Sequence, residues 1–189
     1  MRGWALGTSG NFSAVIGRSP LTLAITTSGI DKGLLEPKHV VEIDERGQVR
    51  RGSGKPSAEA AIHLAVARTR RAGAVLHTHS IWSTILSDRA DGGLSVDGYE
   101  MLKGLDGVKT HEHRETVPGL ANTQDWEAAV PQVEDLLNAH PAAHGFLIRG
   151  HGLYTWGRDL AEAKRHLEIL EFLFEAMGRK RRGETSWPR

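Results

Sequence analysis

The sequence contains no cysteine and has no excess charge of either sign. The absence of cysteine excludes disulfide bonds and thiolate chemistry, so histidine, carboxylate and hydroxyl groups must carry any catalysis or metal binding. The 24 basic and 23 acidic residues leave almost no net charge to attract nucleic acid or an anionic membrane. We therefore expect neither as a partner, and any charged ligand must be recognised locally.

Long hydrophobic runs are missing as well. No stretch approaches the roughly 20 apolar residues of a membrane span, and the first residues, Met1–Trp4, lack the apolar segment of a signal peptide. We accordingly expect a cytoplasmic protein. A chain of 189 residues can bury a core of its own, and we expect residues 1–189 to form a single domain.

Apolar segments between turn-forming residues predict several short strands. Strands are expected at Leu21–Thr26 and at Val40–Ile43, and the second is followed by a hairpin turn over Asp44–Gly47. The apolar segments Ala74–Leu76 and Gly145–Ile148 predict two buried strands. Each of these buried strands leads toward a histidine, so strand ends are where we expect chemistry.

Three helices are expected between and after these strands. The first has Ser57 as its N-cap and ends near Arg71. The second covers Pro131–Ala139, with the proline in the first turn, and the last begins with Asp159 and ends at Gly178. Together the elements predict a mixed α/β domain whose loops are rich in glycine.

The spacing of three histidines is the most informative pattern in the chain. His77 and His79 follow a buried strand, and side chains at i and i+2 of an extended chain point to the same face. His151 lies between Gly150 and Gly152, which allow an imidazole to be presented from a tight turn. Three neutral imidazoles leave a coordination position open, which is typical of catalytic zinc. The sequence therefore predicts an enzyme with a zinc site at these three histidines.

The other histidines are not expected to bind metal. His111 and His113 have the same spacing as the first pair, but no apolar strand precedes them and a polar loop is the better interpretation. Five more lie on helical or loop segments without convergent partners. We expect surface or hydrogen-bonded roles for these five, which are His39, His63, His140, His144 and His166.

Three runs of small residues offer the backbone N–H groups and hydroxyls that bind phosphate oxygens. They are Gly7–Asn11, Thr26–Gly29 and Lys55–Ser57, and the last lies at the N-terminus of the first predicted helix. Each run alone is equally consistent with an ordinary turn. Their occurrence together favours an anionic ligand.

Two carboxylates are candidates for the base that chemistry beside a metal-bound carbonyl requires. Glu59 falls in the first turn of the first predicted helix. Glu100 stands between an aromatic and an apolar residue, surroundings that would raise its pKa. From spacing alone, a surface position for Glu59 and a salt bridge for Glu100 remain the more common alternatives.

The motifs resemble those of the class II aldolase family. The segments that carry this resemblance, in the family's order and spacing, are Gly7–Asn11, Ser28–Gly29, Lys55–Glu59, His77–Ser80 and Arg149–Gly152. The segments that resemble the branch of dehydratases acting on 5-methylthioribulose 1-phosphate are Gly98–Gly104, Gly150–Gly157 and Arg165–Phe172. The resemblance covers nearly the whole chain. It implies a three-layer α/β/α fold with a largely antiparallel central sheet, and a homotetramer with active sites at subunit interfaces.

The resemblance also implies roles for individual residues. One Zn²⁺ per subunit would be held by His77, His79 and His151. The residues that would bind the phosphate of a sugar-phosphate substrate are Thr8, Asn11, Ser28, Gly29 and Ser57. The acid/base glutamate of the dehydratases falls on Glu100, whereas that of the sugar-phosphate aldolases falls on Glu59, where it is sometimes a metal ligand too.

The sequence departs from the family in two places. Aldolases often have a second phosphate-binding serine where this chain has Ala58. The family also has an additional helix before the segment Gly3–Trp4, which here is preceded only by Met1 and Arg2 in the given sequence. We expect the second departure to affect stability or oligomer contacts before it affects chemistry.

The expected function is that of a hydro-lyase in methionine salvage. It is the zinc-dependent dehydration of 5-methylthioribulose 1-phosphate to 2,3-diketo-5-methylthiopentyl 1-phosphate. The segment Gly98–Gly104 favours this reaction over its first alternative, a class II sugar-phosphate aldolase or epimerase. The second alternative, from another class, is a non-catalytic zinc-containing interaction scaffold.

Overall fold

The computed structural model describes residues 2–88 and 92–186. Its strands are β1 Asn11–Arg18, β2 Leu21–Thr26, β3 Val40–Asp44, β4 Val49–Arg51, β5 Ala74–Thr78, β6 Gly93–Val96, β7 Glu115–Leu120, β8 Gly145–Ile148 and β9 Gly152–Gly157. Its helices are α1 Ala60–Thr69, α2 Ile81–Asp88, α3 Trp126–Ala139 and α4 Leu160–Ser186, with short 3₁₀ helices η1 Lys32–Leu34, η2 Pro37–His39 and η3 Glu100–Gly104. All four predicted strands form where the apolar segments indicated.

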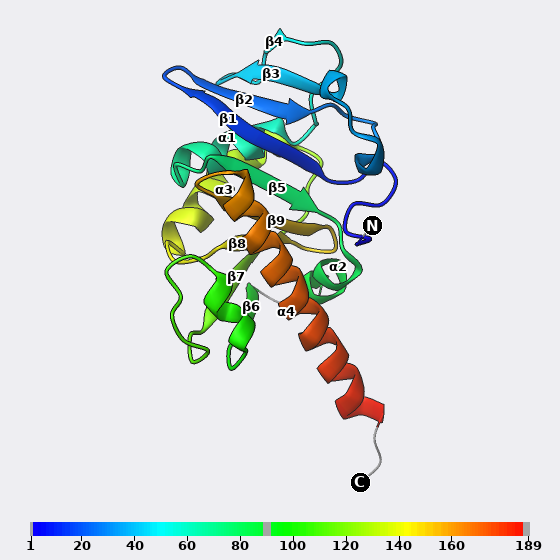
Figure 1. Cartoon of the computed structure of the whole chain (residues 1–189), viewed down its shortest axis with the longest axis vertical. Coiled ribbons are helices and arrows are strands. Elements are labelled where there is room, and N and C mark those ends of the chain that lie inside the picture. The colour runs from blue at the N-terminus through cyan, green and yellow to red at the C-terminus, as the bar shows by residue number, and fades with distance from the viewer. Residues whose placement is uncertain (1, 89–91, 187–189) are drawn as a thin grey trace.

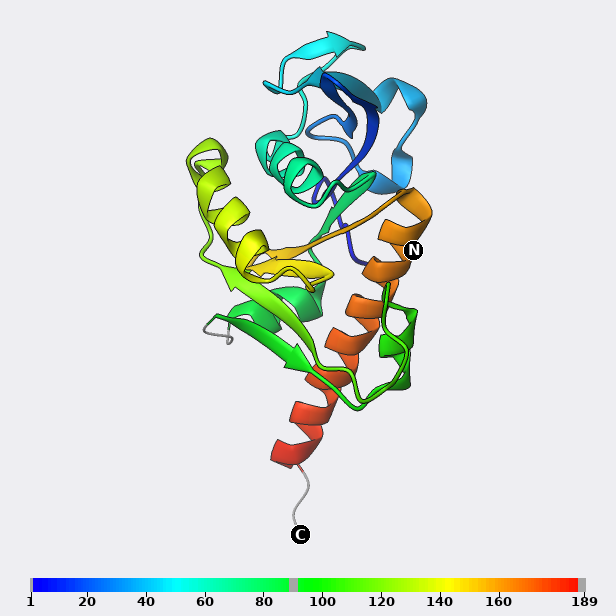
Figure 2. The same cartoon turned by 90° about the vertical axis from the view of Figure 1, so that its left-hand side faces the viewer.

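These strands build one nine-stranded sheet in the order β4-β3-β2-β1-β5-β9-β8-β7-β6 (Figure 1). The pairing of β7 with β8 is parallel, and the other seven pairings are antiparallel. Helices α1 and α3 lie on one side of the sheet and α4 lies on the other, which Figure 2 shows from the side. The expected three-layer α/β/α fold with a largely antiparallel sheet is confirmed.

The alternation of side chains along β5 explains why both faces of the sheet need a helical layer. Val75 packs with apolar residues of α1 and α3, whereas Ala74 and Leu76 pack with α4 on the opposite face. A strand buried on both faces reads as a continuous apolar run, as this one does. The side chain of His77 follows the same alternation and falls on the face of Val75.

Three helix boundaries differ from the sequence prediction, and the first is the start of α1, which begins at Ala60 and has Glu59 at its N-cap position in place of Ser57. Helix α3 begins at Trp126, because the side chain of Asp125 caps it and the buried indole anchors its first turn. Pro131 therefore lies inside the helix, where it costs one backbone hydrogen bond. Helix α4 continues past Gly178 to Ser186. The predicted stop at Gly178 was wrong because this glycine serves packing, since a Cβ there would lie 2.2 Å from the ring of Trp82.

None of the helices in the described part of the chain combines the length and apolar character needed to cross a membrane.

Candidate metal centre

The floor of the site is a row of three side chains across neighbouring strands. In the register of the sheet, Asn11 on β1 lies opposite His77 on β5, and His77 lies opposite Tyr154 on β9. Directly opposite residues share a face of the sheet, and this face is the one that α1 covers. Glu59, at the N-cap position of α1, meets the row from above. The sheet register and the start of one helix thus assemble the site.

The three predicted ligands converge beside this row. His79 directly follows β5 and His151 lies in the turn between β8 and β9. Their Nε2 atoms are 3.0 Å apart, and they lie 2.7 and 3.3 Å from the Nε2 of His77. Ligand nitrogens around a tetrahedral zinc ion are expected at about 3.3 Å from one another. The ligand atoms of the three histidines and of Glu59 all fall within 4.8 Å of one another, so this donor set fits a metal ion.

Hydrogen bonds at the far side of two rings fix the tautomer that a metal requires. The Nδ1–H of His77 donates to the carbonyl oxygen of Leu153 at 2.9 Å. The Nδ1–H of His151 donates to the side-chain oxygen of Asn122 at 3.3 Å. Because Nδ1 carries the proton in both neutral rings, each Nε2 presents a lone pair to the centre.

The surroundings also keep the imidazoles uncharged. Burial, together with the proximity of His79 and His151, lowers the pKa of His77 well below its usual value. Burial lowers the pKa of His79 to about 4, with a further contribution from His151. Burial also lowers the pKa of His151, although the charge of Glu59 opposes it. Neutral imidazoles are the form that binds metal, so the site is prepared for an ion at neutral pH.

Glu59 is buried at the centre of the site, with 8% of its surface exposed. Its carboxylate accepts hydrogen bonds from Nδ2 of Asn11 at 2.9 Å and from the hydroxyl of Tyr154. Its oxygens also lie 3.3 Å from Nε2 of His77 and 3.4 Å from Nε2 of His151. The structure thus excludes the surface position that spacing left open, and adds a carboxylate to the three imidazoles.

Two glycines allow the close approach of backbones on which the site depends. A Cβ on Gly10, whose φ is +72°, would lie 2.7 Å from the carbonyl oxygen of His77. A Cβ on Gly152 would lie 2.0 Å from the carbonyl oxygen of Thr78, between the two ligand-bearing segments. Only glycine fits at these positions without separating the strands.

The three small-residue runs are brought together next to the metal centre. Backbone hydrogen bonds of 2.9 and 3.3 Å join Thr26–Gly29 to Lys55–Ser57. The amine of Lys32 donates to the carbonyl oxygen of Thr8 at 3.0 Å, and so connects the run Gly7–Asn11 to the same region. These loops form one surface made of backbone amides, hydroxyls and an ammonium group, which suits an anion.

The predicted phosphate-binding residues differ in how free they are. Thr8, Ser28 and Gly29 are exposed and Ser57 is half-buried. The amide of Asn11 is engaged at both ends, because its Nδ2 donates to Glu59 and its Oδ1 accepts from His63. Ser57 does not cap the helix as predicted, because α1 begins later and Glu59 takes that position. Phosphate binding by these residues stays a prediction.

Some residues of the site carried little signal in the sequence. The proximity of the Lys32 ammonium contributes to the low pKa of His79, so this lysine belongs to the site. In the sequence it was only a cation after the second small-residue run. Neither Tyr154 nor Asn122 was predicted from the sequence as a site residue. Their roles arise from strand pairing and loop placement, which local patterns do not contain.

Glu100 lies outside the metal centre of its own chain. It belongs to η3, 72% of its side chain is exposed, and it pairs with Nζ of Lys103 at 2.6 Å and with His111 at 3.9 Å. The neighbouring Leu102 packs against α4, on the opposite side of the sheet from His77. The hydrogen bond and charge of Lys103 lower the pKa of Glu100. The expected rise of this pKa was therefore wrong, because the apolar neighbours in sequence do not surround the carboxylate.

The chain is similar in sequence and in structure to known proteins. The model of the class II aldolase and adducin N-terminal domain matches residues 1–177. The chain is 44% identical over 175 residues to a methylthioribulose-1-phosphate dehydratase of Methylococcus capsulatus, which covers 92% of this chain and 84% of the relative. It is 45% identical over 177 residues to that of Marinobacter nauticus, with the same coverage. An L-fuculose-1-phosphate aldolase of Thermus thermophilus superposes with a TM-score of 0.75 at 25% identity, covering 98% of this chain and 90% of that protein.

Proposed function

The chain belongs to the class II aldolase and adducin N-terminal domain family, and we propose that it is a zinc-dependent hydro-lyase of methionine salvage. It converts 5-methylthioribulose 1-phosphate into 2,3-diketo-5-methylthiopentyl 1-phosphate. The observation that carries this proposal is the convergence of three imidazoles and a buried carboxylate beside loops rich in backbone amides and hydroxyl groups, in a chain 44% identical to a methylthioribulose-1-phosphate dehydratase.

The donor set favours zinc over the harder divalent cations. Three imidazole nitrogens suit zinc, whereas calcium and magnesium prefer oxygen ligands. His77, His79 and His151 would hold the ion, and Glu59 would line its open side. When bound, the ion supplies the Lewis acidity that makes a C–H next to a substrate carbonyl acidic.

The chain's own residues orient the substrate and the carboxylate. Asn11 and Tyr154 fix Glu59 so that it faces the imidazoles. The substrate phosphate would bind the exposed backbone and hydroxyl groups of Thr8, Ser28, Gly29 and Ser57, with Lys32 supplying positive charge. Asn11 would have to exchange one of its two present hydrogen bonds to join them.

We assign the proton transfers to Glu100. Its carboxylate removes the proton from C3, and the resulting acid protonates the hydroxyl group that leaves C4 as water. The enol left behind tautomerises to the diketone. Because Glu100 is exposed and lies on the α4 side of its own chain, we infer that it acts at the metal centre of a neighbouring copy, in a homotetramer with sites at the subunit interfaces.

Mixing two inactive variants tests this arrangement. Glu100→Gln and His79→Ala should each abolish turnover, and Glu100→Gln should retain its zinc. If the site is shared, mixed oligomers refolded from equal amounts restore activity at about a quarter of the sites, because each such site draws its intact halves from different copies. No recovery in verified mixed oligomers would place both residues in one chain and contradict the shared site.

A second candidate reaction follows from Glu59. It is the carboxylate inside the centre of this chain, and a retro-aldol or epimerase reaction on a sugar phosphate could use it as base. Zinc-loaded protein is therefore tested on 5-methylthioribulose 1-phosphate, with fuculose 1-phosphate and ribulose 5-phosphate in parallel. Diketone formation that chelation abolishes supports the dehydratase. Cleavage or epimerisation of the other sugars assigns the aldolase branch, and no reaction with any of the three favours the scaffold.

A further inference from the structure

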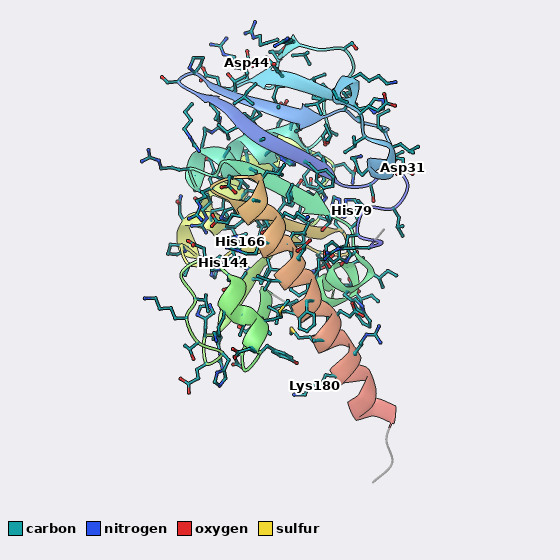
Figure 3. All side chains as sticks on the ribbon, in the orientation of Figure 1. Asp31, Asp44, His79, His144, His166 and Lys180 are labelled. Atoms are coloured by element: carbon teal, nitrogen blue, oxygen red, sulfur yellow. The ribbon has the colours of Figure 1, made fainter. Side chains whose placement is uncertain are left out.

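A second group of histidines surrounds a buried glutamate away from the metal centre. Figure 3 shows His144 and His166 close together and well separated from His79, and the centroids of their rings are 5.0 Å apart. Glu115, the first residue of β7, is 1% exposed. It accepts hydrogen bonds from Nδ1 of His144 at 3.1 Å and from Nε2 of His113 at 2.9 Å. The proposed reaction makes no use of this cluster.

The two adjacent histidines hold both polar backbone groups of one residue. Nε2 of His144 donates to the carbonyl oxygen of Asp106 at 2.9 Å. The backbone N–H of Asp106 donates to Nε2 of His166 at 3.1 Å. His166 is fixed in turn, because its Nδ1–H donates to the carbonyl oxygen of Trp156 at 2.8 Å. The backbone of Asp106 is therefore held between His144, which precedes β8, and His166 of α4. We call this pair of hydrogen bonds the clamp.

The partners of each ring determine its protonation state. Both nitrogens of His144 face groups that only accept, a carboxylate and a carbonyl oxygen, so both must carry protons. Nε2 of His166 faces an N–H donor and must be unprotonated. The directions of the two pKa shifts agree with these protonation states. Burial lowers the pKa of His144, but the hydrogen bond and charge of Glu115 outweigh burial and raise this pKa overall. Burial, with the charge of His144, lowers the pKa of His166.

Other charged groups around the clamp act on the same two rings. Burial alone would raise the pKa of Glu115, but its bonds to His144 and His113 lower it. The charge of Asp106 helps to raise the pKa of His144. On α4, the charge of Glu162 raises the pKa of His166, whereas that of Arg165 lowers it. The net effect favours an imidazolium at His144 beside a neutral imidazole at His166.

The clamped residue belongs to the loop that carries Glu100. The backbone N–H of Gly98 donates to the carbonyl oxygen of His111 at 3.1 Å, which closes the loop 98–111 at its base. Asp106 follows η3 within this loop. Gly104 packs so closely on α4 that a Cβ would lie 2.4 Å from Cδ1 of Ile169. Asp106 and η3, which carries Glu100, are therefore held against the same helix, α4.

We propose that His144, paired with Glu115 and assisted by His166, is a positioning residue that holds the loop 98–111 and thereby sets the location of Glu100. The choice of Glu100 rests on the proposed function. A neutral His144 can donate to only one of its two partners, so the loop is released when this proton is lost.

The sign of the pH dependence follows from the two shifts. The pKa of His144 is raised on folding, so its contribution is complete below about pH 6.5 and is lost as the pH rises through the folded value. The pKa of Glu115 is lowered, so its contribution is complete above about pH 4.3 and is lost as the pH falls through the folded value. The clamp is intact between these limits.

Two matched variants separate positioning from a merely structural role. The amide nitrogen of His144→Gln replaces Nε2 and can still donate to Asp106, whereas that of His144→Asn replaces Nδ1 and reaches only Glu115. We expect kcat to fall about tenfold in His144→Asn, with KM and bound zinc unchanged and faster amide hydrogen exchange in residues 98–111. The kcat of His144→Gln should stay within about twofold of the wild-type value. We expect the wild-type kcat to decline as His144 loses its proton at high pH, and this decline should be absent in His144→Gln.

Equal kcat and equal loop exchange in both variants and the wild type would overturn the proposal. If a variant fails to fold, nuclear magnetic resonance of the wild-type side chain decides. Protons on both His144 nitrogens at pH 6, with loop exchange accelerating as this ring titrates, support the clamp, and a neutral ring at pH 6 contradicts it. If wild-type protein does not dehydrate the substrate, the proposed function fails, while the exchange measurements still decide whether the clamp exists.

Discussion

Replacing Tyr154 with phenylalanine tests the electrostatic design of the metal centre. Tyr154 is fully buried, and its hydroxyl donates to the carboxylate of Glu59. Its ring stacks on His77 with centroids 4.1 Å apart and on Phe146 with centroids 4.9 Å apart. Phenylalanine preserves both ring contacts and leaves almost no cavity. The substitution therefore removes one hydrogen bond to a buried charge and little else.

The size of the effect follows from that single bond. A hydrogen bond to a charged group contributes about 1.5–3 kcal/mol. Glu59 keeps the bond from Asn11, which limits the loss, so we expect Tyr154→Phe to lower the free energy of unfolding of the metal-free protein by about 2 kcal/mol. For a chain of this size, each kcal/mol changes the Tm by about 2–4 °C. The predicted decrease in Tm is therefore about 4–8 °C.

The measurement is urea and thermal unfolding at pH 7 in the presence of a chelator. The matched control is Tyr99→Phe, since the hydroxyl of Tyr99 has no hydrogen-bond partner among the residues that the structure describes. This control should unfold within about 0.5 kcal/mol of the wild type. If Tyr154→Phe and Tyr99→Phe have the same stability, the hydroxyl does not support Glu59 and the reasoning is wrong.

Three further predictions follow from the same region. Burial raises the pKa of Glu171 to about 7, above about 4.3 in the unfolded chain, so the folded state holds its proton longer and stability falls as the pH rises between these values. Between pH 5 and pH 8, the free energy of unfolding should decrease by about 2 kcal/mol less in Glu171→Gln than in the wild type. The same decrease in both proteins would contradict the raised pKa of Glu171. Gly152→Ala should weaken zinc binding by at least tenfold in competition with a chelator, because its Cβ would lie 2.0 Å from the carbonyl oxygen of Thr78. Wild-type zinc affinity in this variant would show that β5 and β9 can move apart without disturbing the site. Zinc at 100 times its Kd should stabilise the protein by about 2.7 kcal/mol in calorimetry, and the same stabilisation in His79→Ala would place the ion elsewhere.

The convergence of the three histidines could be predicted from the sequence because its signal is local. Two histidines two residues apart after an apolar strand share a face by the geometry of an extended chain, and His151 stands between glycines. The structure places the three imidazoles together as the spacing indicated. The strands β2, β3, β5 and β8 were predictable for the same reason, since apolar runs and turns are properties of neighbouring residues.

Tertiary structure decided everything that depends on contacts between distant segments. The pairing of Asn11, His77 and Tyr154 follows from strand register, and the burial of Glu59 follows from where α1 begins. Gly178 is a packing position because α2 lies against α4. Periodicity and local propensity carry no information about which side chain lies opposite another.

The two glutamates show this division most clearly. The sequence identified Glu59 and Glu100 as candidates but could not separate a central carboxylate from an exposed one. In the folded chain, Glu59 is buried and accepts hydrogen bonds from Asn11 and Tyr154. Glu100 is exposed and forms an ion pair with Lys103. The sequence by itself determined which chemical groups are present and how neighbours along the chain are spaced. Only tertiary structure decided which of them meet, because burial and pairing depend on segments that are far apart in the chain.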